Sequence, residues 1–228
     1  MEELTLKQLN RLENKPYFSV KDPISALTHF IGFVAGVFLT PVLLIKGVSD
    51  GLNILGLCSL SAFSLSMMIL YAASTTHHSL VLPPRPNRII RKFDHMSIFL
   101  LIAGTYAPVC VVSLKDSGGS KLLLAIVILM VLGIVFKAVW INCPKYVSSI
   151  TYIAMGWLVL FNITKVYHAL VPAGFYLLLA GGLFYTIGGI IYALKFSINK
   201  DWGHHEIFHV FILLGTLCHF LMICFYVA

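Results

Sequence analysis

The segment His205-Glu206-Ile207-Phe208-His209, followed by VFILLGTLCHFLMICFYVA at residues 210–228, indicates a membrane-spanning helix with a polar entrance. The apolar run carries no formal charge, and its length suits a hydrocarbon core of ~30 Å. His205 and His209 are four residues apart, so on a helix they share one face, which is the spacing that two imidazoles need to bind one metal ion. Such pairs also occur as solvated or packing residues, so further ligands must come from the rest of the chain.

The composition indicates an integral membrane protein, because 59% of the 228 residues are hydrophobic and only 11% are charged. Soluble domains are about half apolar and about a quarter charged. The net charge of +7 does not predict nucleic-acid binding, since the positive residues lie in short loops between apolar runs, where they set orientation. We expect membrane lipids as partners, and no protein partner is indicated. The five cysteines are scattered without a CxxC pair and are interpreted as packing residues.

The predicted fold is an all-α membrane protein with a seven-transmembrane helix bundle. Residues 1–21 form a polar N-terminal segment, either a short amphipathic helix or a tail, and residues 22–228 form the membrane domain. The fifth apolar run is the shortest. The expected spans are Ile24–Ile45, Leu52–Thr76, Phe93–Leu114, Leu122–Trp140, Val147–Ile163, Pro172–Ala193 and His205–Ala228.

The distribution of Lys and Arg predicts the orientation. With the N-terminus in the cytoplasm, twelve positive residues lie inside and four outside, which places the C-terminus outside. The outer four are Lys46, Lys115, Lys121 and Lys165.

This topology brings four helix ends with polar residues to one membrane depth, near the cytoplasmic face. His78, at the end of the second span, could join His205 and His209 in a three-histidine site whose fourth position is open to water, as in catalytic zinc sites. Ser74 lies one helical turn before His78 and could orient the ligand or the water. Asp94 could accept the proton of that water. The first span contributes Asp22, Ser25 and His29 at the same depth.

Other interpretations of these residues remain open. Asp94 could instead pair with Arg91 or Lys92 at the interface, and His77 is expected to be a polar interface residue that points elsewhere. His29 could line a pocket, and its role stays open at this point. The remaining histidines are expected at the interface or in packing, namely His95, His168, His204 and His219.

The segment 205–209 also matches H-E-x-x-H, in which Glu206 would be the general base of a metalloprotease. A first-turn acid that complements the helix dipole is the preferred interpretation of Glu206.

These motifs together resemble the hemolysin III family, the bacterial branch of the progestin and adipoQ receptor superfamily, from Asp22 to the C-terminus. The resemblance rests on DPISALTHFIG at 22–32, Ser74-x-x-x-His78, KFDH at 92–95, LIAGTYAP at 101–108, YIAMGW at 152–157 and His205-x-x-x-His209. It implies a multi-pass protein of the bacterial cell membrane with an inner N-terminus and a Zn²⁺ ion near the cytoplasmic side. The implied zinc ligands are His78, His205 and His209, with Asp94 near the metal's water and Ser74 behind the ligands. His77 departs from the family, which commonly has Tyr at this position.

The leading functional expectation is a zinc-dependent hydrolase of a lipid amide, similar to the ceramidase-like relatives that the resemblance implies. Asp94 would be the base and Ser74 would help hold the oxyanion. The alternatives are a non-enzymatic membrane-lipid sensor with a structural zinc, and a cytolysin. The cytolysin is disfavoured because a pore needs polar residues through the bilayer, and spans four, six and seven lack them.

Overall fold

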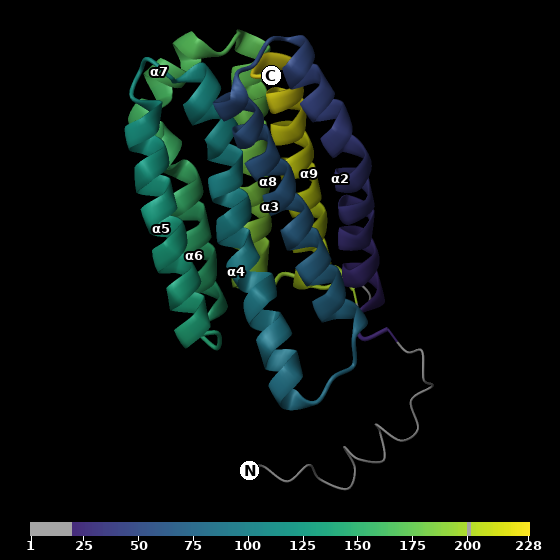
Figure 1. Ribbon diagram of the computed structural model, residues 1–228. Helices are drawn as coiled ribbons and strands as arrows, with labels where there is room; N and C mark the ends of the chain where they lie inside the picture. Colours follow the sequence, from purple (N-terminus) through teal and green to yellow (C-terminus); the bar gives the residue numbers. More distant parts are fainter. Residues whose placement is uncertain (1–19, 200–201) are drawn as a thin grey trace, which may run out of the picture.

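A computed structural model describes residues 20–199 and 202–228, and within these ranges seven helices are long and apolar enough to cross a membrane. The helices run side by side in one bundle (Figure 1). The predicted seven-span, all-helical architecture is therefore confirmed at this level. The predicted N-terminal segment lies almost entirely outside the described residues.

The spans have the following bounds. They are α2 (Pro23–Ser49), α3 (Ile54–Ser79), α4 (Pro84–Pro108) with the π-helix η1 (Val109–Ser113), α5 (Gly119–Val139), α6 (Lys145–Gly156) with the 3₁₀-helix η2 (Trp157–Asn162) and α7 (Ile163–Ala169), α8 (Pro172–Leu194), and α9 (His204–Tyr226).

Two spans differ from the sequence-based expectation. The third helix begins at Pro84, whereas the apolar run predicted a start at Phe93. Arg85, Arg88 and Arg91 lower the hydropathy of the first turns, so the apolar run begins later than the helix. The fifth span is not the shortest: α6, η2 and α7 form one stretch of 25 residues. Lys165 and Asn162 interrupted the apolar run in the sequence, whereas the structure continues through them in altered helical geometry.

Local signals explain several helix ends. Pro23 opens α2 in the first turn, where a proline loses no hydrogen bond. The side chain of Asn53 accepts a hydrogen bond from Gly56 N at 3.0 Å and caps α3. Beyond the last turn of α5, the Arg91 guanidinium donates to the Ile141 carbonyl at 3.1 Å, and Lys92 donates to the carbonyl of Ala138. The two cations thus satisfy carbonyls at the end of α5.

Close packing between α8 and α9 depends on small residues. A Cβ on Gly181 would lie 2.4 Å from His219 Nε2, and a Cβ on Gly215 would lie 2.4 Å from the Tyr185 ring. Small residues at such contacts let membrane helices approach closely. Across the same contact, Thr216 of α9 accepts hydrogen bonds from Tyr71 at 2.7 Å and from Tyr185 at 2.9 Å, which joins α3, α8 and α9.

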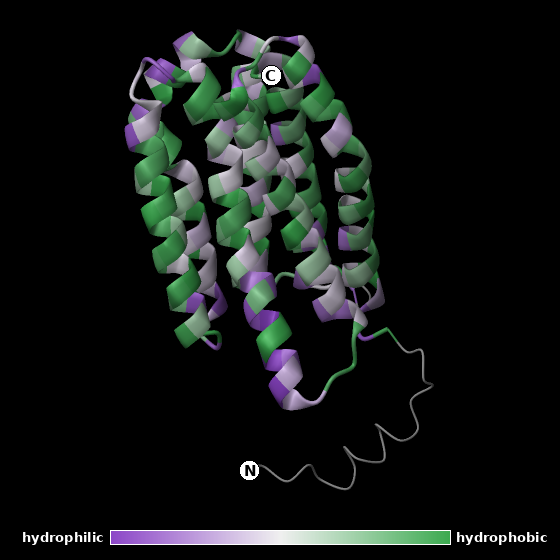
Figure 2. Cartoon of the chain, in the orientation of Figure 1, coloured by the Kyte–Doolittle hydropathy of each residue, from purple (hydrophilic) through white to green (hydrophobic). Residues whose placement is uncertain are grey.

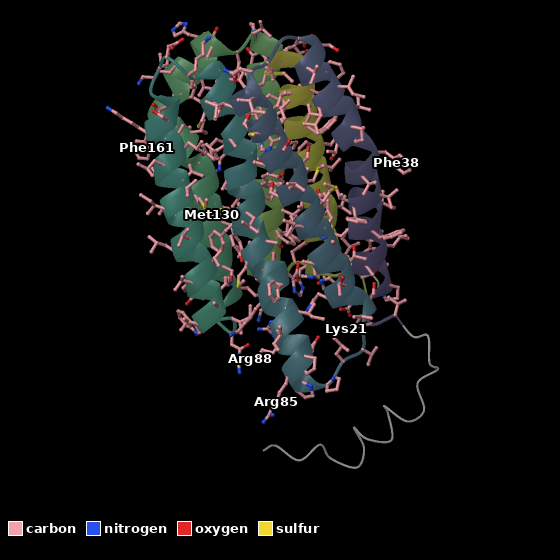
Figure 3. All side chains as sticks on the ribbon, viewed as in Figure 1. Lys21, Phe38, Arg85, Arg88, Met130 and Phe161 are labelled. Carbon is pink, nitrogen blue, oxygen red and sulfur yellow. The ribbon has the colours of Figure 1, made fainter. Side chains whose placement is uncertain are left out.

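Polar and basic residues gather at one end of the bundle. Figure 2 shows the hydrophilic first turns of α4 extending beyond the apolar body. Figure 3 shows Lys21, Arg85 and Arg88 at that same end, whereas Phe38, Met130 and Phe161 lie along the apolar sides. This end also carries the first turn of α9 and the last turn of α3, so the histidine motifs meet there.

Candidate metal centre

Three histidines from two helices converge at the polar end of the bundle. His78 ends α3, and His205 and His209 lie one turn apart at the start of α9. His205 Nε2 lies 3.0 Å from His78 Nε2 and 3.1 Å from His209 Nε2. His78 and His209 are buried, and one ring nitrogen from each of the three residues lies within 4.8 Å of the other two. The three side chains could therefore hold one metal ion.

The hydrogen bonds on the far side of the rings show that this donor set fits a cation. His78 Nδ1 lies 2.9 Å from the Asp22 carboxylate, and His209 Nδ1 lies 3.1 Å from the carbonyl of Ser25. Both oxygens can only accept, so Nδ1 carries the proton in each ring and Nε2 presents a lone pair. His205 Nε2 can offer one proton at most to these two lone pairs. A cation at the point where the nitrogens meet removes this conflict, and the outer carboxylate and carbonyl fix the ring orientations as in known metal sites.

Asp22 is held beside His78 by the backbone as well. Its N–H donates to the carbonyl of His78 at 2.9 Å, so the chain entering α2 is tied to the end of α3. The hydrogen bond with His78 holds the pKa of the Asp22 carboxyl below its usual range, which favours the ionised acceptor.

Asp94 and Ser74 lie next to this cluster. Asp94 of α4 is 8% exposed, and its Oδ2 lies 4.0 Å from His78 Nε2. The expected alternative partners of Asp94 are bound elsewhere, since Arg91 and Lys92 contact the end of α5. Ser74 is buried, and its hydroxyl is directed at the Asp94 carboxylate. The structure thus brings together all five residues that the sequence analysis named for the site.

Two further histidines extend the cluster. His29 is 2% exposed and stacks on His209 with ring centroids 3.7 Å apart, so it lines the interior. His77 is buried rather than interfacial, and its Nε2 accepts from Lys21 Nζ at 3.4 Å. His77, His78 and Asp94 form a second group whose donor atoms lie within 4.8 Å of one another. Both groups include His78. If both use the same nitrogen of the His78 ring, one ion can occupy either group but not both.

Glu206 has the helix-end role that the sequence favoured. One carboxylate oxygen accepts from Gly203 N at 3.1 Å, at the start of α9, and the other accepts from Ser25 Oγ at 2.9 Å. With both oxygens engaged, Glu206 joins α9 to α2 and is poorly placed to act as a general base.

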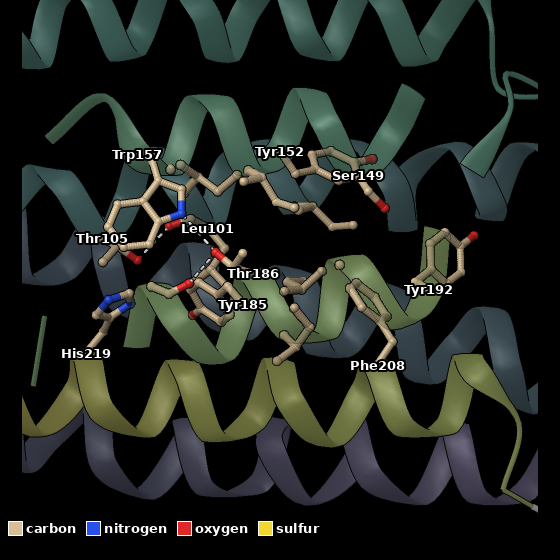
Figure 4. A pocket seen from close by; sticks show the side chains of 18 of the residues that line it. Leu101, Thr105, Ser149, Tyr152, Trp157, Tyr185, Thr186, Tyr192, Phe208 and His219 are labelled. Carbon is tan, nitrogen blue, oxygen red and sulfur yellow. Dashed lines mark hydrogen bonds between the residues drawn. The ribbon is translucent and has the colours of Figure 1, made fainter. Parts of the chain in front are cut away.

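A cavity runs from the histidine cluster into the bundle, between α4, α6, α8 and α9. Its volume is about 120 Å³, roughly ten times the space that one water needs, which suits a narrow linear chain. Most of the wall is apolar or aromatic. At the end formed by the histidine cluster, the wall includes Asp94, Ser74, His205 and His209. Figure 4 shows Tyr192 and Phe208 toward one end of the cavity and Trp157, Thr105 and His219 toward the other.

The sequence analysis missed the far end of this cavity. His219 was expected to be a packing or interface residue, and it is indeed buried, at 5% exposed; its place in the cavity wall, together with Trp157 and Tyr185, was not expected. Its position in an apolar run could have indicated a functional role, since polar residues inside membrane helices usually face the bundle interior. The residues that face it come from other helices, which no pattern within one helix can predict.

Comparison with known proteins agrees with the motifs. The family model described as Haemolysin-III related matches residues 18–220. A Hemolysin-3 homolog of Bacillus subtilis (strain 168) is 35% identical over 210 residues, covering 92% of this chain and 96% of the relative. Hemolysin-3 of Bacillus cereus is 35% identical over 209 residues, covering 91% of this chain and 93% of the relative. The chain therefore belongs to the haemolysin-III related family.

Proposed function

We propose that this protein is a zinc-dependent hydrolase of a lipid amide. The observation that carries the proposal is the meeting of three imidazole donors, two of them buried, with one carboxylate and the end of an apolar cavity. Three histidines leave a coordination position open, as in catalytic zinc sites, whereas structural zinc sites are usually closed by four protein ligands. Bound zinc supplies Lewis acidity and makes water nucleophilic near neutral pH.

The protein's own groups have distinct roles in this proposal. His78, His205 and His209 hold the ion, and Asp22 and the Ser25 carbonyl orient two of the rings. The Asp94 carboxylate accepts the proton of the attacking water and returns it to the leaving amine. The hydroxyl of Ser74, next to Asp94, donates a hydrogen bond to the carbonyl oxygen as negative charge develops on that oxygen.

The cavity supports a lipid rather than a water-soluble substrate. The cavity begins at the histidine cluster and continues toward the middle of the bundle, and its wall is largely apolar. An acyl chain enters from the bilayer and lies in this cavity, with its amide at the histidines. The positive residues at the same end support a cytoplasmic position for the histidines, with the N-terminus inside and the C-terminus outside.

The test is turnover of a long-chain N-acyl amide by the purified protein in detergent, with zinc content measured in parallel. Asp94→Asn is expected to lower kcat/KM by roughly 10²–10⁴-fold, the range of a lost general base, while the protein retains its zinc. His205→Ala is expected to lose both zinc and activity. His168→Ala, an exposed histidine of α7, is the matched control and is expected to behave as the wild type. Hydrolysis that persists after the bound zinc has been removed would refute the proposal.

A lipid sensor with a structural zinc is the second candidate. It is supported by the location of the ligands on two different helices. The site joins α3 to α9 and is supported by α2, so zinc would stabilise the bundle without any chemistry. In that case chelation lowers the Tm, and no lipid amide is turned over. A pore-forming function, suggested by the names of the relatives, has less support because the wall of the interior cavity is largely apolar.

A further inference from the structure

His219, which lines the far end of the cavity, has one ring nitrogen without a hydrogen-bond partner among the described residues. His219 lies ten residues beyond His209 on α9, about 15 Å deeper at 1.5 Å per residue. Its Nε2 lies 3.3 Å from the carbonyl of Leu178, and its Nδ1 has no partner among the described residues. Figure 4 shows the ring extending from α9 toward Thr105 and Trp157.

The contact with Leu178 fixes which atom of His219 remains available. A carbonyl oxygen only accepts, so Nε2 carries the proton and donates it to Leu178. In a neutral imidazole the other nitrogen is then an acceptor. An unpaired acceptor in an apolar interior costs free energy until a donor reaches it. A ligand group that satisfies Nδ1 must therefore donate a hydrogen bond, which a hydroxyl does and a ketone does not.

The other polar groups around His219 are already paired. Thr105 Oγ donates to the carbonyl of Leu101 at 2.9 Å, and Thr186 Oγ donates to Gly182 and accepts from Trp157 Nε1. The Tyr185 hydroxyl contacts Thr216 at 2.9 Å. Among the described residues at this end of the cavity, His219 Nδ1 is the one buried side-chain atom left unsatisfied.

We infer that His219 forms a subsite for a hydroxyl group carried by the acyl chain of the ligand, so that the preferred lipid is a hydroxylated one. This rests on the proposed function only in placing the acyl chain in the cavity with its head at the histidine cluster. Two carbon–carbon bonds advance an extended chain by about 2.5 Å, so 15 Å corresponds to roughly twelve carbons between the head and the hydroxyl.

The probes are fatty acids, which are the product side of the proposed hydrolysis and are not consumed. Tetradecanoic acid, the same acid with a hydroxyl on the penultimate carbon, about twelve carbon–carbon bonds from the carboxyl carbon, and the same acid with a ketone there are mixed in equal amounts. They compete for the purified zinc-loaded protein in detergent, and native mass spectrometry measures the bound fractions. Chains shorter and longer by two carbons locate the depth of the subsite.

The hydroxy acid is expected to bind roughly fivefold more tightly than the matched keto acid, as for one net hydrogen bond. His219→Phe keeps a ring in place but removes the acceptor, and it is expected to abolish this preference. His168→Phe is the control, because His168 is exposed on α7, and it is expected to retain the preference. Because the hydroxy–keto comparison is made in the wild type, a poorly folded variant does not affect it.

Equal binding of the hydroxy and keto acids at every chain length overturns the inference, as does a preference that persists in His219→Phe. Failure here is distinguishable from failure of the proposed function. Amide hydrolysis without a hydroxyl preference refutes only the subsite, whereas a hydroxyl preference without hydrolysis refutes only the enzyme.

Discussion

Replacing Asp22 tests the metal centre through a residue that does not contact the ion. Asp22→Asn keeps a neutral acceptor for His78 Nδ1–H at a similar length but removes the negative charge, which roughly halves the strength of the hydrogen bond. Loss of such an outer partner typically weakens metal binding by 10–100-fold. The Asp22 side chain is 40% exposed, so water compensates in part and the lower end of that range applies.

We therefore expect Asp22→Asn to weaken zinc binding by about tenfold, or about 1.4 kcal/mol, and Asp22→Ala to weaken it further. The assay is a competition titration of the purified protein against a chelator of known zinc affinity. Asp50→Asn is the matched control, because Asp50 pairs with Lys46 at the opposite end of the bundle. Unchanged affinity in Asp22→Asn, or an equal loss in Asp50→Asn, would refute the assignment of Asp22 as the residue that orients His78.

Three other predictions concern stability, mechanism and orientation. Thr216→Val leaves the hydroxyls of buried Tyr71 and partly buried Tyr185 without their acceptor and is expected to lower stability by about 1–3 kcal/mol in thermal unfolding, whereas Thr216→Ser is expected to remain close to the wild type. Glu206→Gln is expected to retain hydrolysis with at most about 1 kcal/mol of lost stability, and complete loss of activity with intact zinc would instead identify Glu206 as the general base. A reporter enzyme that is active only outside the cytoplasm is expected to be active when fused after Ala228, and an inactive but expressed fusion contradicts the orientation.

The sequence predicted the helices well because apolar length is a direct consequence of bilayer thickness. The predicted bounds were wrong where a helix contains charged residues and where the type of helix changes. The first turns of α4 contain Arg85, Arg88 and Arg91, so a hydropathy pattern places the start of the span at Phe93 although the helix begins at Pro84. In the fifth span, Tyr106 on α4 accepts from Val159 N at 2.8 Å and donates to the Gly156 carbonyl at 2.6 Å. A tertiary contact thus satisfies backbone groups at the change of helix type, which no local pattern could indicate.

The candidate site was predictable to the extent that helix ends fix membrane depth. The alternating direction of the spans placed His78, Asp94 and the pair His205 and His209 near one face, and the structure brings their side chains together. The burial of His77 and the position of His219 depend instead on contacts across helices, with Lys21 and with Gly181. These contacts are set by side-chain packing, and hydropathy carries no information about them.

The site residues and most of the cavity wall come from different helices or different turns, which has a consequence for specificity. α2, α3, α4 and α9 supply the groups with chemistry, whereas α6 and α8, with the deeper turns of α4 and α9, supply most of the wall that a chain would touch. The wall and the metal end are joined by the packing of α9 on α8, through Gly181 and Gly215. Substitutions on the wall can therefore change which chain is bound without disturbing the histidines, provided that this glycine contact is kept. If the proposed function holds, relatives that share the five site residues but differ along α6 and α8 are expected to prefer different lipids, because the cavity wall and the histidine cluster are formed by separate sets of residues.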